Sequence, residues 1–197
     1  IKMIIKSYEV QKNQTNLFKY NFYLLYGENF GLKKDIKDII KLAIKQKNDS
    51  LEIMSIYESE ILDNEENLYN SIYSGSLFSN KKIIIIFDAT DKIIKKINNI
   101  YDSRVENVIL VIVSGILEKK SKLRSFFETN KKTICIPCYL DSQKDLEIIA
   151  KSEFRKNNIS LSSEAINLLI EKSNSDRGNL KNEIEKIKAY LDRKSVV

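Results

Sequence analysis

The sequence predicts an α/β domain built on a parallel sheet and followed by an all-helical part, and three observations support this fold class. Short β-prone apolar runs alternate with amphipathic helical patterns from Phe22 to Ile136, as in parallel sheets with helices on both faces. After Tyr139 the strand patterns stop and only helical patterns follow. The 197 residues, 43% of them apolar, are enough for a core in one domain or in two small ones. We expect two parts, residues 1–140 and residues 141–197.

Runs of apolar and β-branched residues predict five strands. The first run, Phe22 to Tyr26, stops at Gly27. The isoleucine run at residues 83–87 and the run at residues 108–113 are apolar without interruption, which is typical of strands buried on both faces. The five predicted strands cover residues 22–26, 51–57, 83–87, 108–113 and 133–136.

Helical periodicity fills the segments between these strands and the region after residue 140. Asn29 is placed to cap a helix whose apolar stripe faces the core and whose lysines face solvent. The stripe comprises Leu32, Ile36, Ile39, Ile40 and Ala43, and the lysines are Lys33, Lys37, Lys41 and Lys45. Further helices are expected at residues 65–73, 91–101 and 119–129. The C-terminal part is expected to form helices at 141–157, from Ser162, and from about residue 176, the last with Leu180, Ile184, Ile187 and Leu191 facing inward.

The composition excludes several functional classes. The chain has no His, which rules out Ser-His-Asp and Cys-His triads and His-ligated zinc sites. Its net charge of +6 invites a nucleic-acid interpretation, but the lysine pairs are scattered along the chain. Residues 1–5 are too short and too broken by Lys2 for a signal peptide, and no apolar run is long enough to span a membrane. We expect a cytoplasmic protein with no membrane partner.

Residues 26–34 lie where a phosphate loop would lie, between the first strand and its helix. A working loop has the pattern G-x-x-x-x-G-K-[ST], whose backbone N–H groups, lysine and hydroxyl hold phosphates and Mg²⁺. Here Gly27 and Gly31 are one residue too close, and no Ser or Thr follows Lys33. A degenerate loop that serves as a strand-to-helix turn is favoured, so we predict no bound cofactor.

Asp88 follows the isoleucine strand, where a Walker-B carboxylate would bind Mg²⁺. The next residues are Ala89 and Thr90 rather than a second acid, which favours a turn or cap aspartate. Because both halves of an ATP site are degenerate together, we predict that the chain does not hydrolyse ATP.

Cys135 and Cys138 have the C-x-x-C spacing of dithiol oxidoreductases. The first cysteine of such a site needs a helix N-terminus, whereas Cys135 lies late in a predicted strand. Zinc would need two further ligands, and the chain has no other Cys and no His. We expect structural thiols and no metal site.

The segment from Ser74 to Lys82 carries Leu77 and Phe78 side by side, between a predicted helix and the isoleucine strand. Two adjacent bulky residues on a short loop cannot both point into a core, so at least one is expected to be exposed. The pair would then fit an apolar pocket of a partner. A loop anchor packed under the sheet is the alternative, and the residues alone do not choose between the two.

These segments together resemble the delta subunit of bacterial DNA polymerase III, a component of the sliding-clamp loader. The resemblance covers nearly all of the chain and depends on the order and spacing of its parts. Those parts are residues 22–29, residues 76–82 directly before the strand at 83–87, residues 120–124 and residues 178–187. The resemblance implies a divergent AAA+ domain with a three-helix lid that has lost ATP binding.

The resemblance also implies a function within a DNA-directed DNA polymerase assembly. A member of this family binds the beta sliding clamp and favours the open ring. Carried over by position, Leu77 and Phe78 insert into the clamp, and Gly75 and Ser76 shape the loop. The implied partners are the clamp, the gamma/tau and delta prime subunits, and primer-template DNA within the assembly. The family's helical collar domain is not expected within these 197 residues.

Two other functions compete with this one. An ATP-hydrolysing subunit of the loader would need an intact phosphate loop and an acidic pair at Asp88. A lysine-driven nucleic-acid module would bind DNA as an isolated chain, with an affinity that falls steeply with salt.

Overall fold

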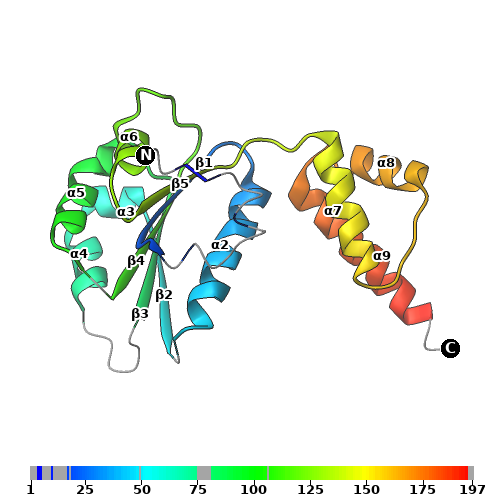
Figure 1. Ribbon diagram of the computed structural model, residues 1–197, viewed down its shortest axis with the longest axis horizontal. Helices are drawn as coiled ribbons and strands as arrows, with labels where there is room; N and C mark the ends of the chain where they lie inside the picture. The colour runs from blue at the N-terminus through cyan, green and yellow to red at the C-terminus, as the bar shows by residue number, and fades with distance from the viewer. Residues whose placement is uncertain are drawn as a thin grey trace. The chain divides into compact units, whose positions relative to one another are not determined.

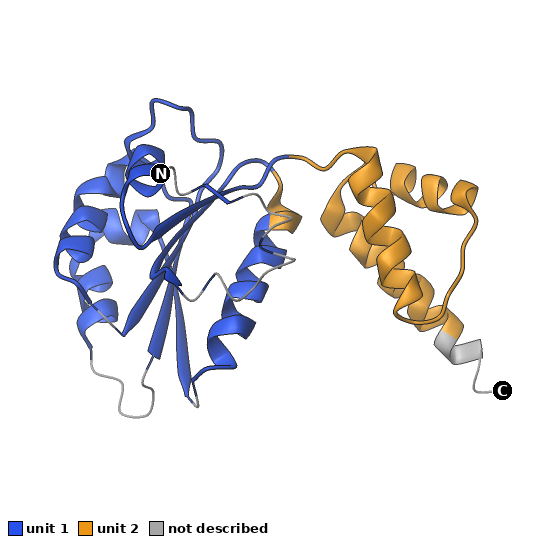
Figure 2. Ribbon diagram, viewed as in Figure 1, with its two compact units in different colours: residues 1–28, 33–139 blue, residues 29–32, 140–197 orange. Residues whose placement is uncertain are grey.

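The computed structural model describes residues 4, 5, 10, 17, 19–48, 50–74, 81–105 and 107–194. The chain divides into two compact units, which Figure 2 shows in different colours. Unit 1 comprises residues 1–28 and 33–139, and unit 2 comprises residues 29–32 and 140–197. The first turn of one helix therefore belongs to the second unit, although the rest of that helix belongs to the first.

Unit 1 contains a parallel sheet of five strands among its described residues (Figure 1). The strands are β1 (Phe22–Tyr26), β2 (Leu51–Tyr57), β3 (Lys81–Phe87), β4 (Val108–Val113) and β5 (Thr133–Pro137). Their order across the sheet is β2-β3-β4-β1-β5, and every neighbouring pair is parallel. The predicted α/β fold class is confirmed, and all five predicted strands are present.

Helices cover both faces of this sheet (Figure 1). The main part of α2 (Phe30–Lys45) lies on one face, and the other face carries α3 (Glu58–Asp63), α4 (Glu66–Tyr73), α5 (Ile94–Asp102) and α6 (Lys122–Thr129). Helix α3 was not expected, because six residues are too few for a helical period to show. Helix α6 begins later than expected, since Ser121 caps it and the Asp91 carboxylate accepts the N–H groups of Lys122 and Leu123.

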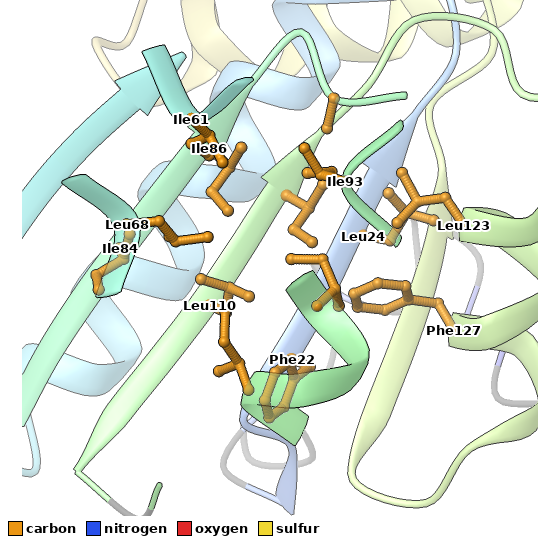
Figure 3. Packing of buried hydrophobic residues seen from close by; sticks show 14 of the residues in the cluster. Phe22, Leu24, Ile61, Leu68, Ile84, Ile86, Ile93, Leu110, Leu123 and Phe127 are labelled. Atoms are coloured by element: carbon orange, nitrogen blue, oxygen red, sulfur yellow. The ribbon is translucent and has the colours of Figure 1, made fainter. Parts of the chain in front are cut away.

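The core of unit 1 follows from the alternation of side chains along buried strands. Leu24, Ile84 and Leu110 point to the face covered by α3–α6, where they meet Leu68 and Phe127 (Figure 3). All five side chains are at most 1% exposed. Each contributes about 1.5–3 kcal/mol by burial, so this cluster holds helices α3–α6 against one face of the sheet.

Unit 2 is a small helical unit built on α7 (Gln143–Arg155), α8 (Ser163–Lys172) and α9 (Arg177–Lys194). The hydroxyl groups of Ser142 and Ser162 cap α7 and α8. The core of this unit comprises Leu146, Ala150, Phe154, Ile166, Leu169, Ile170, Leu180 and Ile184. Leu191 was expected to face inward but is 37% exposed, because the last turns of α9 extend past the other two helices (Figure 1).

No helix in the described ranges is long and apolar enough to cross a membrane.

Candidate functional site

The loop that follows β1 is closed by the backbone of neighbouring loops. Gly27 has φ 126°, a conformation that side chains rarely adopt, and a Cβ there would lie 2.3 Å from the carbonyl oxygen of Cys138. The N–H of Gly27 donates to the carbonyl oxygen of Gly115 at 2.9 Å. A phosphate cradle needs such N–H groups to be available, and this one is engaged by the neighbouring loop.

Lys33 was expected on the solvent face of α2, and this expectation is wrong. Lys33 is only 3% exposed. Its Nζ donates to the carbonyl oxygens of Gly27 at 2.8 Å and Ser114 at 2.9 Å. Burial lowers the pKa of the Lys33 ammonium group by more than the nearby Cys138, Asp88 and Glu28 raise it. The helical period misplaced Lys33 because these two carbonyl groups, which come from other segments, compensate for burying the charge.

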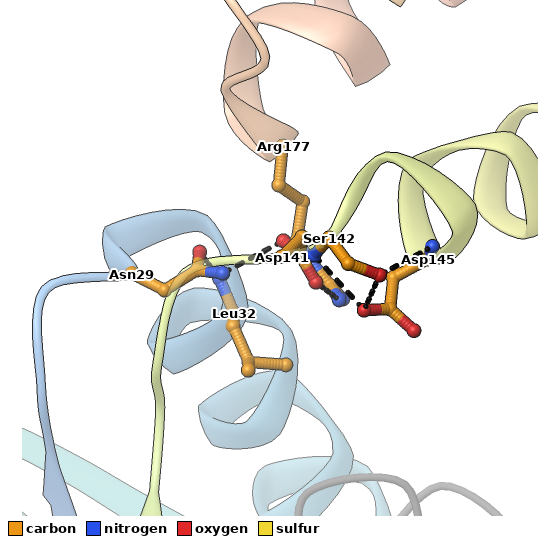
Figure 4. A network of polar contacts seen from close by, with 6 residues as sticks. All are labelled: Asn29, Leu32, Asp141, Ser142, Asp145 and Arg177. Carbon is orange, nitrogen blue, oxygen red and sulfur yellow. Dashed lines mark hydrogen bonds and ion pairs between the residues drawn. The ribbon is translucent and has the colours of Figure 1, made fainter.

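Asn29 caps α2, as predicted, and it also belongs to a polar network within unit 2 (Figure 4). Its Oδ1 accepts the N–H of Leu32 at 2.9 Å, and its Nδ2 donates to Asp141 at 2.7 Å. Arg177 donates to both carboxylate oxygens of Asp141, from Nε at 2.7 Å and from a terminal nitrogen. The side chains of Arg177 and Asp141 are 7% and 6% exposed, so this is a buried ion pair.

Gly31, the second glycine of the degenerate loop, serves this same part of unit 2. A Cβ at Gly31 would lie 3.0 Å from the backbone nitrogen of Gly178 and 3.2 Å from Cβ of Arg177. The glycine therefore permits the first turn of α2 to approach the start of α9 closely. This role in packing needs no phosphate.

The segment after β3 carries a turn rather than a catalytic acid pair. Asp88 adopts φ 56°, as a turn residue can. The carboxylate of the buried Glu58 accepts the N–H of Thr90 at 2.7 Å and its hydroxyl at 2.9 Å. The Glu58 carboxylate thus bonds the backbone of the turn that follows β3. Sequence reasoning missed Glu58 because it lies in the unexpected helix α3.

Cys135 and Cys138 are both free thiols with no exposed surface. Burial raises the pKa of the Cys135 thiol to about 12, which opposes thiolate chemistry at neutral pH. Among the described residues, no group of three or more His, Cys, Asp or Glu side chains is placed to hold a metal ion.

The residues expected to bind the clamp, Gly75, Ser76, Leu77 and Phe78, lie outside the described residues. The two ends of their segment are described, and Lys82 joins them. Its Nζ donates to the carbonyl oxygens of Ser71 at 2.8 Å and Ser74 at 3.0 Å, and to the Ser74 hydroxyl at 3.0 Å. Glu52 lies 3.8 Å away as a partial counter-ion. We call Ser71, Ser74, Lys82 and Glu52 the stem, because together they fasten the end of α4 to the start of β3.

The stem was not expected, since Lys82 reads in the sequence as half of an ordinary lysine pair. Lys82 is nevertheless 5% exposed. Tyr73, the last residue of α4, is 55% exposed. The Tyr73 hydroxyl donates to the Ser103 hydroxyl at 3.0 Å, and its ring stacks on Tyr69 with centroids 6.3 Å apart.

Comparison with known families decides where this chain belongs. A family model described as "DNA polymerase III, delta subunit" matches residues 23–139, which is more than half of the chain. The chain belongs to the DNA polymerase III delta subunit family. Most of the matched residues belong to unit 1, which holds the stem, while residues 29–32 of the matched range belong to unit 2.

Solved structures of other proteins share the fold of this delta-family chain. The Bacillus subtilis DNA clamp loader delta protein, YqeN, matches with a TM-score of 0.60 at 13% identity, over 94% of this chain and 57% of that one. Domain III of the Thermotoga maritima replication initiation protein DnaA matches with 0.51 at 18% identity, over 96% and 82%. The Thermotoga maritima RuvB Holliday junction branch migration motor matches with 0.57 at 14% identity, over 96% and 61%.

These likenesses confirm the predicted AAA+-like fold, an α/β domain followed by helices. The chain spans only 57% of the length of the Bacillus subtilis delta protein. A search of curated proteins found no match to the sequence of this chain.

Proposed function

We propose that this delta-family chain binds the bacterial beta sliding clamp through Leu77 and Phe78 and helps to open the ring. Gly75 and Ser76 shape the loop that carries the pair. Membership of the delta family supports the proposal, and the observation that carries it is the stem. Lys82 of β3 bonds three oxygen atoms of Ser71 and Ser74 at the end of α4, so the described residues on the two sides of the 75–80 segment are joined.

A fixed stem favours docking for an energetic reason. Two side chains of this size contribute about 3–5 kcal/mol by burial in an apolar pocket. Ordering a free loop would offset part of that gain. Because the stem already fixes both ends of the segment, more of the burial energy remains to offset the strain of an opened ring interface.

In this proposal the chain neither binds nor hydrolyses ATP. The Gly27 N–H and the Lys33 ammonium group are both engaged by carbonyl groups, which disfavours the alternative of an ATP-hydrolysing loader subunit. Residues 1–140 act as the AAA+-like domain and residues 141–197 as its lid. The partners are the gamma/tau and delta prime subunits and, within the assembly, primer-template DNA. Clamp loading on chromosomal DNA implies the cytoplasm.

The double variant Leu77→Ala/Phe78→Ala tests the proposal. We expect it to abolish binding of the chain to the cognate clamp, measured by calorimetry, while the melting temperature changes little. A matched control is Leu42→Ala/Phe30→Ala, which removes the same residue types where they are 59% and 75% exposed. Unchanged clamp binding by the Leu77/Phe78 variant contradicts the proposal, and a large loss of melting temperature would support the loop-anchor interpretation instead.

A further inference from the structure

A cavity of about 480 Å³ opens at the end of the sheet where β1, β4 and β5 begin. Its wall includes the rings of Phe22 and Tyr101, whose centroids lie 5.5 Å apart in an edge-to-face arrangement. Its charged lining residues are Asp102, Arg104, Lys131 and Lys132. Neither the proposed insertion of Leu77 and Phe78 nor the degenerate phosphate loop uses this cavity.

The charge of the cavity is unbalanced among its described lining residues, with three cations against one carboxylate. Arg104, Lys131 and Lys132 are all exposed. Within the described part of the chain, none of these three side chains forms an ion pair or a side-chain hydrogen bond, whereas many other surface lysines pair with a neighbouring acid, as Lys156 does with Glu153 at 2.7 Å. The cavity therefore offers three cations to a carboxylate or another anion from outside.

Hydrogen bonds connect this cavity to the stem. Tyr73, the last residue of α4, donates its hydroxyl to Ser103, which directly precedes Arg104. The Tyr101 hydroxyl donates to the carbonyl oxygen of Lys131 at 2.7 Å. The backbone N–H of Lys82 donates to the carbonyl oxygen of Asn107 at 2.9 Å. The ends of α4 and α5 and the starts of β3 and β4 thus share one edge of unit 1 (Figure 1). The cavity therefore lies on the same edge of unit 1 as Ser74 and Lys81, the described residues on either side of residues 75–80.

The area needed for a specific contact supports a second point of attachment. A leucine and a phenylalanine bury roughly 350 Å² between them, whereas a specific interface covers about 800 Å² on each partner. A partner held by these two residues must therefore contact further surface of the chain.

We infer that the cavity at Arg104, Lys131 and Lys132 is a second docking point for the same partner, the sliding clamp, and that it receives an acidic segment of the clamp surface. This inference rests on the proposed function. The Leu–Phe pair supplies apolar burial, and the three cations attract the acidic segment from a distance and set the orientation in which the clamp arrives. Such rim charges act chiefly on the association rate, and salt screens them over about 8 Å at physiological ionic strength.

Charge reversal tests the inference on the whole 197-residue chain. We expect Arg104→Glu/Lys131→Glu/Lys132→Glu to slow association with the cognate clamp by about tenfold at low salt, with a much smaller effect at high salt. Arg104→Gln/Lys131→Gln/Lys132→Gln should have an intermediate effect. A matched control is Lys34→Glu/Lys119→Glu/Lys120→Glu, which makes the same charge change on exposed residues that follow the carboxyl ends of β1 and β4.

The outcomes separate the inference from the proposed function. If both triple reversals slow association equally, or neither does, the inference is wrong while binding through Leu77 and Phe78 can still stand. If the Leu77→Ala/Phe78→Ala variant binds the clamp normally, the proposed function fails and the inference fails with it. If the Arg104/Lys131/Lys132 reversal weakens binding to primed DNA and leaves clamp binding unchanged, the cavity is a nucleic-acid site and the inference is overturned. Circular dichroism of each variant confirms that the fold is retained.

Discussion

The ammonium group of Lys33 lies 2.8 Å from the carbonyl oxygen of Gly27, so the lysine of the degenerate loop bonds the backbone of that same loop. Its second acceptor, the carbonyl oxygen of Ser114, lies at the end of β4. In a phosphate-binding loop the lysine reaches the terminal phosphates instead. Here the lysine instead joins α2 to the loops after β1 and β4. We therefore expect its loss to lower the stability of the protein and to leave nucleotide binding unchanged.

Lys33→Met should destabilise the protein without changing nucleotide binding. The variant leaves two carbonyl groups without their charged donor, and we expect a loss of about 1–3 kcal/mol in the free energy of unfolding. The exposed Lys34→Met serves as the control and should change it by less than about 0.5 kcal/mol. Urea denaturation measures both variants, and ATP titration of the unmodified chain should give no binding. A measurable ATP affinity that Lys33→Met removes would restore the ATP-hydrolysing alternative.

Gly27→Ala should be strongly destabilising, whereas Gly115→Ala should not. Gly27 has φ 126° and no room for a Cβ beside Cys138, while nothing lies within 4 Å of a Cβ at Gly115. We expect a loss of about 2–4 kcal/mol for the first and a change near zero for the second. The melting temperatures of the two variants measure this difference. They compare a position with positive φ and no room for a Cβ with one where a Cβ meets no neighbour.

Lys82→Met should weaken clamp binding although it leaves Leu77 and Phe78 in place. Without the ammonium group the carbonyl oxygens of Ser71 and Ser74 lose their donor, so the end of α4 and the start of β3 are no longer joined before binding. We expect several-fold weaker affinity for the clamp. Lys95→Met, an exposed lysine on α5, is the control. Equal affinities for the two variants would mean that the stem has no part in docking.

Asp141→Asn should destabilise unit 2 by about 3–5 kcal/mol, because it leaves the buried Arg177 guanidinium without its counter-ion. Asp141→Leu/Arg177→Met removes both charges and should recover most of that loss. Lys156→Met breaks an exposed ion pair with Glu153 and should cost no more than about 1 kcal/mol. Chemical denaturation followed by circular dichroism distinguishes the three. A double variant no more stable than Asp141→Asn would argue against a coupled pair.

Cys135 should react with iodoacetamide slowly at pH 8 in the folded protein and rapidly in urea, because burial raises the pKa of its thiol to about 12. The same shift links stability to pH. The folded state holds the proton more tightly than the unfolded state, so the contribution is complete below about pH 9 and is lost as pH rises toward 12. Cys135→Ala should therefore show a smaller alkaline loss of stability than the unmodified chain. Rapid native alkylation at pH 8 would contradict the buried thiol.

The strands and most helices could be predicted from the residues because local pattern and tertiary environment agree there. The isoleucine run at 83–87 admits little besides a buried strand, and Asn29 both begins a helical pattern and caps α2. The failures lie where distant segments supply the partner. Lys33 was expected to face solvent and no pattern singled out Lys82, yet each is buried against carbonyl groups.

Sequence was therefore sufficient for the α/β-then-helical order, the delta-family resemblance and the degeneracy of the phosphate loop. Each of these depends on the order and spacing of residues along the chain. The buried pair Arg177–Asp141, the stem at Lys82 and the cationic cavity beside it emerge only from the folded chain. They join residues from separate elements, and one-dimensional periodicity does not report which carbonyl or carboxylate will meet a given charge once the strands and helices pack.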